Sequence, residues 1–241
     1  MRYAILGDIH ANLEALQTVI EQCEKNGVDK YLCIGDIVGY NADPGACLDL
    51  IRSLPLAGVT MGNHDEMASE DTDLVGFNPQ AAFAIEWTRK QLSDEQRQWL
   101  ANLRLSMQIG KITLVHATLD SPRRWGYIFD KHSAGASFSY QFSQICFCGH
   151  SHVPLAFEKF GSIQGGKYKE IRVQAGHKYL VNVGSVGQPR DGDWRSAFVI
   201  YDTDENLITL HRIPYDIKKS QEKILKAGLP ERLALRLEKG T

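Results

Sequence analysis

The stretch AILGDIH, residues 4–10, contains the pattern that decides the fold. A short apolar run, typical of a buried strand, ends at Gly7 and is followed at once by Asp8 and His10. Residues i and i+2 of an extended segment point the same way, so these two side chains can converge on one ion. A single Asp-x-His after a strand is more often a turn with a helix cap, so a metal site needs partners from elsewhere in the chain.

Four other apolar runs end in the same way. They are LCIGDIVGY (32–40), VTMGNHD (59–65), TLVHAT (113–118) and CFCGHSH (146–152). Together they contribute Asp36, Asn63, His64, Asp65, His116, His150 and His152. In open α/β sheets ligands bind outside the carboxyl ends of the strands, so we expect these side chains at one rim. A glycine before a cluster lets the backbone turn tightly or approach a ligand closely.

The order of apolar and polar segments predicts an α/β fold. Strands at 2–7, 30–35 and 56–62 alternate with helices at 12–27 and 44–53, which favours a parallel sheet. Helices are expected from Asn78 to Lys90 and from the capping box of Ser93 and Gln96. After Val153 the strands alternate with turns, which favours antiparallel pairing. A polar helical tail, interrupted near Gly228 and Pro230, ends the chain. Two packed sheets with helices outside accommodate both halves.

Composition narrows the class of protein. With 241 residues, of which 43% are hydrophobic, the chain suits a single domain over residues 1–241 with a sizeable core. A net charge of -2 gives no dedicated nucleic-acid surface. No apolar run reaches the roughly 18 residues that span a bilayer, and no signal peptide is seen, so we expect a cytoplasmic protein with no membrane contact.

The cysteines point the same way. Their number, five, is odd, and their spacing shows no disulfide framework, which suits a reduced compartment. Cys146 and Cys148 form a C-x-C that could touch a metal, but we interpret both as strand residues. His132, His177 and His211 lie outside the strand-end pattern, and His211 is expected on a surface strand.

The donor types at the strand ends indicate the kind of metal site. Imidazole, carboxylate and amide oxygen suit manganese, iron, nickel or zinc, and the missing thiolates argue against a structural zinc site. The donors are more numerous than one ion needs. Two divalent ions about 3.5–4 Å apart, sharing a carboxylate, would use them all. Manganese is the first choice, with iron, nickel or zinc as alternatives.

The motifs, taken in order, resemble those of the calcineurin-like metallophosphoesterases. The shared pattern is D-x-H, G-D, G-N-H-[DE], a lone histidine and G-H-x-H, and it extends through VNVGSVGQPRDGD (181–193). That last segment is similar to a turn of the small bacterial and archaeal phosphodiesterase branch, with Val183 where relatives commonly have proline. GDIVGYNADP (35–44) and HATLDSPRRWGYI (116–128) resemble stretches of proteins near the diadenosine tetraphosphatases.

The resemblance implies a four-layer αββα sandwich, two mixed β-sheets flanked by helices, and a set of ligand roles. One ion would be held by Asp8, His10, Asp36 and His152. The other would be held by Asp36, Asn63, His116 and His150, with Asp36 bridging. His64 would not bind metal but would contact the substrate phosphate or leaving group.

These roles predict a metal-dependent phosphoesterase. A metal-bridging hydroxide would attack phosphorus in a phosphodiester or nucleotide polyphosphate, and His64 would donate to the leaving oxygen. Asp65 is a candidate for orienting His64, although sequence neighbours often point apart. Arg190 is a candidate phosphate clamp or a surface arginine beside Asp191. Residues 123–127 form either a stacking wall for a nucleobase or a packed loop.

Other functions remain as alternatives. A non-catalytic scaffold of the same fold would be expected to lose ligands or the equivalent of His64, and this chain keeps them. A nuclease would favour a basic groove. A protein phosphatase would carry further arginine motifs that this chain lacks. The substrate is expected to be a small phosphoester or nucleotide, and an oligomer is possible.

Overall fold

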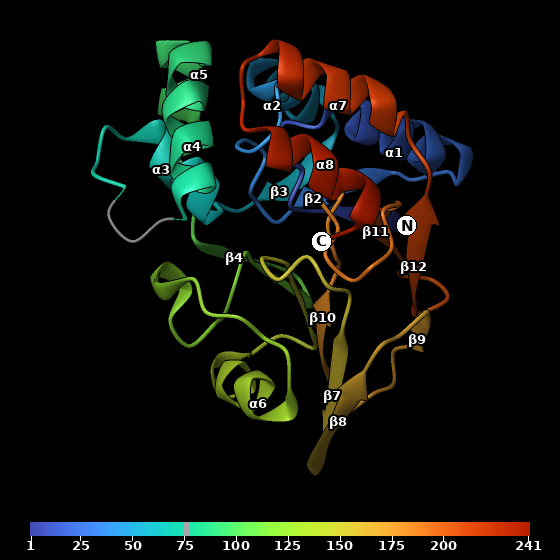
Figure 1. The fold of residues 1–241 in the computed structure, drawn as a ribbon. Coiled ribbons are helices and arrows are strands. Elements are labelled where there is room, and N and C mark those ends of the chain that lie inside the picture. Colours follow the sequence, from blue (N-terminus) through green and yellow to red (C-terminus); the bar gives the residue numbers. More distant parts are fainter. Residues whose placement is uncertain (75–77) are drawn as a thin grey trace.

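The computed structural model describes residues 1–74 and 78–241 (Figure 1). Within these ranges the first half of the chain alternates strands and helices. Its elements are β1 (Arg2–Leu6), α1 (Leu13–Lys25), β2 (Lys30–Cys33), α2 (Pro44–Ser53), β3 (Leu56–Val59), α3 (Asn63–Ser69), α4 (Pro79–Gln91), α5 (Asp94–Ala101), β4 (Ser106–Ile109) and β5 (Ile112–Val115).

The second half is richer in strands. Its elements are the 3₁₀ turn η1 (Pro122–Arg124), α6 (Lys131–Tyr140), β6 (Ile145–Cys148), β7 (Ala156–Phe160), β8 (Ser162–Gly166), β9 (Glu170–Arg172), β10 (Lys178–Asn182), β11 (Ser196–Asp202), β12 (Leu207–Ile213), α7 (Ile217–Lys226) and α8 (Glu231–Lys239). The expected helix from Pro44 to Ser53 and the capping box of Ser93 and Gln96 are confirmed.

The strands form two six-stranded mixed sheets. The first has the order β3-β2-β1-β11-β12-β9, and the second has the order β4-β5-β6-β10-β7-β8. Strands β1, β2 and β3 pair in parallel, as the strand–helix alternation predicts, and β11 joins β1 antiparallel. The fold class predicted from the sequence is therefore confirmed.

The core explains why the sheets stack. On β1, Ala4 and Leu6 face the helix side, where they pack with residues of α1 and α2, whereas Ile5 faces the second sheet. Phe147 of β6 meets Ile5 in this layer between the sheets. On the outer face of the second sheet, Phe138 of α6 completes a further cluster. Alternate residues of each strand thus bury against two different layers, which produces the αββα sandwich.

Two expectations about the second half need correction. The segment KYLVNVG was expected among antiparallel strands, but β10 pairs in parallel with β6 and antiparallel only with β7. Four of the five β10 residues are buried, because the strand lies inside the sheet.

The C-terminal tail is not simply polar: α7 and α8 pack Ile224, Leu233 and Leu237 against Ala84 of α4.

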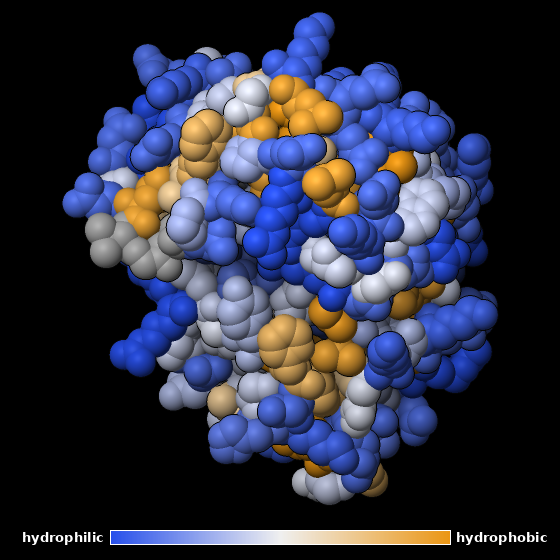
Figure 2. Space-filling model, in the orientation of Figure 1, coloured by the Kyte–Doolittle hydropathy of each residue, from blue (hydrophilic) through white to orange (hydrophobic). Residues whose placement is uncertain are grey.

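No helix among residues 1–74 and 78–241 combines the length and the apolar character needed to cross a bilayer. The face on which α7 and α8 lie carries mainly hydrophilic side chains (Figure 2).

Candidate metal centre

The seven predicted ligands come from five separate segments. Two groups of buried side chains have ligand atoms within 4.8 Å of one another, namely Asp8, His10, Asp36 and His152, and Asp36, His116 and His150. Asp36 belongs to both groups, as a bridging carboxylate would. The remaining predicted ligand, Asn63, is the first residue of α3. Its Oδ1 is buried without a hydrogen-bond partner in the described structure, so it is available to a cation.

Backbone carbonyls fix the orientation of three histidine rings. Nδ1 of His10 lies 3.2 Å from the Val38 carbonyl oxygen. The corresponding distances are 2.8 Å for His116 and Ile34, and 2.6 Å for His152 and Gln188. A carbonyl oxygen can only accept, so each Nδ1 carries the hydrogen and donates it. The Nε2 lone pair of each neutral ring is then left for a metal ion, as in most histidine ligands.

The inward atoms crowd around the two carboxylates. Nε2 of His10 and Nε2 of His152 are 3.1 Å apart. Nε2 of His152 is 3.2 Å from Asp8 Oδ1, and Nε2 of His116 is 3.3 Å from Asp36 Oδ2. Nε2 of His116 is also 3.2 Å from Nδ1 of His150. Nitrogen and oxygen donors so close together and shielded from solvent are an arrangement that cations stabilise.

Unusual backbone conformations deliver these side chains. Asp8, Asp36, His150 and His152 have φ between 50° and 66°, and His10 has φ 49°. Such left-handed conformations are costly for residues other than glycine and tend to gather at functional sites. Among the described residues other than glycine, most of those with this conformation belong to the metal centre or its rim.

Two glycines are required by close approach. A Cβ added at Gly62 would lie 2.1 Å from Asp36 Oδ1, and one added at Gly149 would lie 2.3 Å from Asp8 Oδ2. In these two strand-end motifs the glycine therefore leaves space for the carboxylate of another motif, which is the close approach that the sequence predicts.

The turn at residues 182–188 supports the centre through hydrogen bonds to the ligand loops. Ser185 Oγ donates to the Asp8 carbonyl oxygen at 2.7 Å. Asn182 Nδ2 donates to the Gly149 carbonyl oxygen at 2.6 Å and to Ser151 Oγ at 3.0 Å. The segment with Val183 in place of proline thus holds two ligand loops by hydrogen bonds.

Burial and charge set the protonation of the cluster. Burial by itself would raise the pKa of Asp8, but the imidazoles of His152 and His116 together lower it below its ordinary value. Burial would lower the pKa of His116, but the Asp36 carboxylate raises it to about 9. Burial lowers the pKa of His150 to about 3. The carboxylates thus attract positive charge, while most rings stay neutral and able to bind a metal.

His64 lies at the edge of the cluster. Its ring centroid is 4.7 Å from that of His10 and 4.4 Å from that of Tyr40. Its backbone N–H donates to Asp36 Oδ1 at 2.8 Å. Burial lowers the pKa of His64 to about 4. The side chain lines the hollow next to the metal ligands, as expected for a residue that contacts substrate.

Asp65 has a different place from the one expected. Its carboxylate accepts hydrogen bonds from four backbone N–H groups, those of Asp36, Ile37, Val38 and Gly62, at 2.7–3.3 Å. Burial raises the pKa of Asp65 to about 7, and the nearby Asp36 carboxylate adds to this. Asp65 therefore ties the loop after β2 to the start of α3. We assign it to positioning Asp36, in place of the expected orientation of His64.

A hollow of about 240 Å³ opens over the cluster. Its lining includes Asn63, His64, Trp125, Tyr127 and Arg190. The Tyr127 ring stacks on His150 at 4.3 Å, and Trp125 meets His116 edge-on at 5.8 Å. These two aromatic residues of the 123–127 segment therefore form a wall of the site.

The two arginines of that segment lie elsewhere. Arg123 is exposed and its Nε lies 3.4 Å from Glu66 Oε1, outside the hollow lining, and Arg124 is also exposed. Arg190 is not paired with its neighbour Asp191, because the Asp191 carboxylate forms an ion pair with Arg212. Instead, the Arg190 guanidinium lies over the Tyr40 ring at 5.6 Å, inside the hollow. The structure thus places Arg190, half-buried, in the lining of the hollow, and not as a surface arginine beside Asp191.

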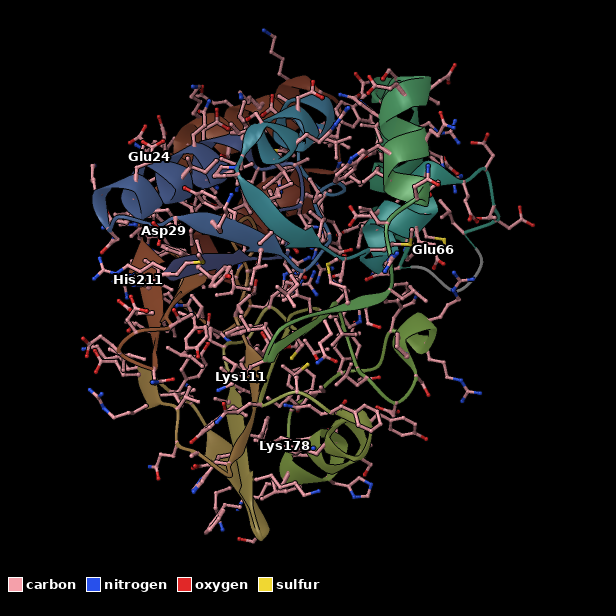
Figure 3. The ribbon with its side chains drawn as sticks, turned by 180° about the vertical axis from the view of Figure 1, so that it is seen from behind. Glu24, Asp29, Glu66, Lys111, Lys178 and His211 are labelled. Carbon is pink, nitrogen blue, oxygen red and sulfur yellow. The ribbon has the colours of Figure 1, made fainter. Side chains whose placement is uncertain are left out.

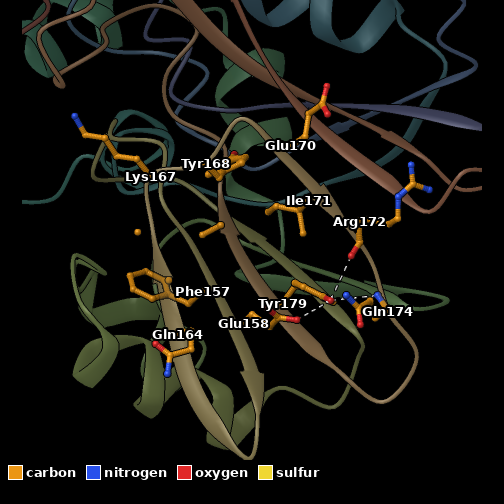
Figure 4. A pocket seen from close by; sticks show the side chains of 13 residues that line it. Phe157, Glu158, Gln164, Lys167, Tyr168, Glu170, Ile171, Arg172, Gln174 and Tyr179 are labelled. Carbon is orange, nitrogen blue, oxygen red and sulfur yellow. Dashed lines mark hydrogen bonds between the residues drawn. The ribbon is translucent and has the colours of Figure 1, made fainter.

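Groups outside the centre conform to the simpler expectations. The five cysteines are buried and free, and burial raises the pKa of both Cys146 and Cys148. His211 lies on β12, on the side of the molecule opposite Glu66 (Figure 3). A separate hollow of about 370 Å³ lies beside β7, β8 and β9, where Glu158 accepts a hydrogen bond from Tyr179 (Figure 4).

Tyr40 and the arginines of α8 were missed by sequence reasoning. Tyr40 follows Gly39, where a Cβ would lie 2.4 Å from Nδ1 of His64. Arg232 and Arg236 approach Tyr40 only because α8 folds back over α4. The Gly39-Tyr40 pair, shortly after Asp36, could have indicated from the sequence that Tyr40 lies at the site. Nothing in the sequence marks Arg232 or Arg236 in this way.

Comparisons with known proteins agree with this centre. Residues 1–206 match the model of the calcineurin-like phosphoesterase superfamily domain. An uncharacterized protein of Methanocaldococcus jannaschii is 39% identical over 238 residues, which is 97% of this chain and 96% of the relative. The crystal structure of a metallophosphoesterase from Sphaerobacter thermophilus superposes with a TM-score of 0.88 and 38% identity, covering 100% of this chain and 99% of that one.

A hypothetical protein from Pyrococcus horikoshii shares the fold at a TM-score of 0.80 and 19% identity, covering 100% of this chain and 98% of that one. The family model covers most of the chain and includes all seven candidate ligands. The chain belongs to the calcineurin-like phosphoesterase superfamily.

Proposed function

We propose that this protein is a dinuclear metal-dependent phosphoesterase that hydrolyses phosphodiesters or nucleotide polyphosphates. The observation that carries the proposal is the set of buried Nε2 atoms that face Asp8 and Asp36, each from a ring whose Nδ1–H is held by a backbone carbonyl. Such a preorganised set of imidazole nitrogens and shared carboxylates fits two divalent cations.

The assignment of ligands follows the two groups. Asp8, His10, Asp36 and His152 would hold one ion, and Asp36, Asn63, His116 and His150 the other. The donors are imidazole, carboxylate and amide oxygen without a thiolate, which suits manganese, iron, nickel or zinc, and manganese is our first choice. Two such cations would supply Lewis-acid stabilisation of phosphoryl oxygens and an activated water.

Protein side chains around the metal ligands would bind the substrate and assist the leaving group. His64 and Arg190 line the hollow above the ligands, and both can hydrogen-bond a phosphate oxygen or the leaving group. Trp125 and Tyr127 line the same hollow, where their rings contact His116 and His150. The small volume of the hollow favours a small phosphoester over a folded protein substrate.

The test is an assay of the protein after treatment with chelator. We expect hydrolysis of bis-p-nitrophenyl phosphate or diadenosine tetraphosphate to vanish without metal and to return with Mn²⁺. With metal added, His64→Ala should turn over about 10²–10⁴-fold more slowly than the wild type. His132→Ala is the matched control, because His132 is exposed on α6 away from the centre.

Whichever of the two substrates is hydrolysed more efficiently in this assay decides between phosphodiesters and nucleotide polyphosphates. A protein that binds two ions but hydrolyses neither substrate with any of the four metals would contradict the proposal. It would favour the alternative of a non-catalytic metal-binding scaffold of the same fold.

A further inference from the structure

A second hollow adjoins the one above the metal ligands. It has a volume of about 380 Å³ and is lined by Tyr40, Asn78, Gln80, Tyr127, Arg190, Arg232, Arg236 and Thr241. Four of these, Tyr40, Asn78, Tyr127 and Arg190, also line the first hollow, so the two hollows lie next to each other. Two of the lining arginines come from α8, which lies beyond residues 1–206 that match the family model.

The second hollow concentrates positive charge. Arg190 and Arg236 both lie over the Tyr40 ring, with guanidinium carbons 5.6 Å and 5.9 Å from its centroid. Burial lowers the pKa of Arg236 to about 10, and the charges of Arg190 and Arg232 add to the effect. Three cations therefore line one hollow, and a bound anion would offset the repulsion that Arg236 experiences from the other two.

No carboxylate side chain in the described structure pairs with these three arginines. Arg190 donates to the neutral Gln188 Oε1 at 2.8 Å, and its neighbour Asp191 is taken by Arg212. Arg236 Nε donates to the Thr241 carbonyl oxygen at 2.5 Å, which leaves its Nη nitrogens for a ligand. Arg232 is exposed at the mouth of the hollow.

Helix α8 is fixed in place by packing and by hydrogen bonds, so its two arginines have defined positions. Leu233 and Leu237 pack against Ala84. At the end of the helix the Gly240 carbonyl oxygen accepts from the Gly192 N–H at 2.9 Å, two residues after Arg190. The Arg190 N–H in turn donates to the carbonyl oxygen of the ligand His152 at 3.2 Å. The cationic hollow is thus built onto the metal centre.

We propose that Arg190, Arg232 and Arg236 form a subsite for a second phosphoryl group of the substrate. The substrate class is then a compound with at least two linked phosphoryl groups, one placed over the metal ligands and the next over Tyr40 toward α8. Arginine suits this task because its planar fork binds phosphate oxygens in pairs. The proposal deepens the proposed function and rests on it for the position of the cleaved phosphorus.

The test compares two substrates on the manganese-loaded enzyme. Diadenosine tetraphosphate carries linked phosphoryl groups, whereas bis-p-nitrophenyl phosphate carries one. We expect the ratio of kcat/KM for the first to kcat/KM for the second to fall about tenfold in Arg232→Gln and in Arg236→Gln. Lys239→Ala, which removes an exposed charge from the same helix, should leave the ratio at the wild-type value.

Arg232→Gln is the decisive variant, because Arg232 has no described hydrogen bond whose loss would disturb α8. An unchanged ratio in folded Arg232→Gln would overturn the subsite. If the wild type hydrolyses neither substrate, the proposed function fails and the subsite is tested by calorimetry. Inorganic tripolyphosphate, supplied as its manganese complex, should then bind the wild type about tenfold more tightly than Arg232→Gln, and more tightly than orthophosphate binds. Equal binding would overturn the subsite independently of catalysis.

Discussion

Nε2 of His10 lies 3.1 Å from Nε2 of His152, while both rings use Nδ1 to donate to backbone carbonyls. Two neutral rings held in this way present lone pairs to each other, which is unfavourable unless a proton or a cation lies between or beside them. The backbone therefore prepares this pair for an ion, and the two rings come from segments 142 residues apart in the chain.

Removal of one of these rings should cost one ion. We expect His152→Ala to bind about one metal ion per chain where the wild type binds two, because the group around His116 and His150 stays intact. Elemental analysis after gel filtration measures the ratio. His132→Ala should keep the wild-type ratio, and an unchanged ratio in His152→Ala would count against the ligand assignment.

His64→Ala should separate metal binding from turnover. The ring lines the hollow but belongs to neither ligand group, so both ions should remain. We expect kcat to fall about 10²–10⁴-fold, the range of a lost general acid. Loss of metal together with activity would instead make His64 a ligand or a structural support.

Gly149→Ala tests the close approach of the loop to Asp8. The added methyl group would lie 2.3 Å from Asp8 Oδ2 and must displace the carboxylate. We expect the free energy of unfolding to fall by about 1–3 kcal/mol and metal affinity to fall with it. Denaturant unfolding and metal titration measure the two effects. Gly135→Ala in α6 is the matched control, because its methyl group would find ordinary contact at 3.4 Å.

Asp65→Ala should act mainly on stability. Four backbone N–H groups around Asp36 would lose their acceptor inside the protein. We expect the free energy of unfolding to fall by about 2–4 kcal/mol. Asp71→Ala, at an exposed ion pair with Arg97, should change it by less than about 1 kcal/mol. Similar losses in both variants would argue against the positioning role of Asp65.

The sequence predicted the elements that are local and missed those that depend on distant contacts. Asp8, His10 and the GHSH motif follow strands whose apolar runs can be recognised without a partner, so their meeting at one rim could be foreseen. The role of Asp65 could not, because three of its four backbone donors lie in a loop 27–29 residues away. Two further features depend on which buried faces pack together: the parallel pairing of β10 with β6 and the return of α8 over Tyr40. The order of residues in the chain does not specify such packing.

The docking of α7 should depend on pH through Glu14. Glu14 Oε1 lies 2.7 Å from Lys223 Nζ and 3.3 Å from Lys219 Nζ. Burial by itself would raise the pKa of Glu14, but the hydrogen bond from Lys223 and further partners lower it below the ordinary value of 4.5. A lowered folded-state pKa gives stability that is present above the unfolded pKa and is lost as the pH falls through the folded value.

We therefore expect the free energy of unfolding of the wild type to exceed that of Glu14→Gln by about 1–2 kcal/mol, constant from pH 8 to pH 6. This difference should disappear as the pH falls below about 4.5. Denaturant unfolding at several pH values measures this difference. A difference that stays the same down to pH 3 would show that the ion pair with α7 does not contribute as described.

The central claim is that the buried cluster holds two metal ions that share Asp36. Anomalous diffraction from crystals grown with Mn²⁺ tests it most directly. We predict two peaks, one between Asp8, His10 and His152 and one beside Asn63, His116 and His150, with the Asp36 carboxylate in contact with both. A single peak, or peaks away from Asp36 at saturating Mn²⁺, would contradict the account.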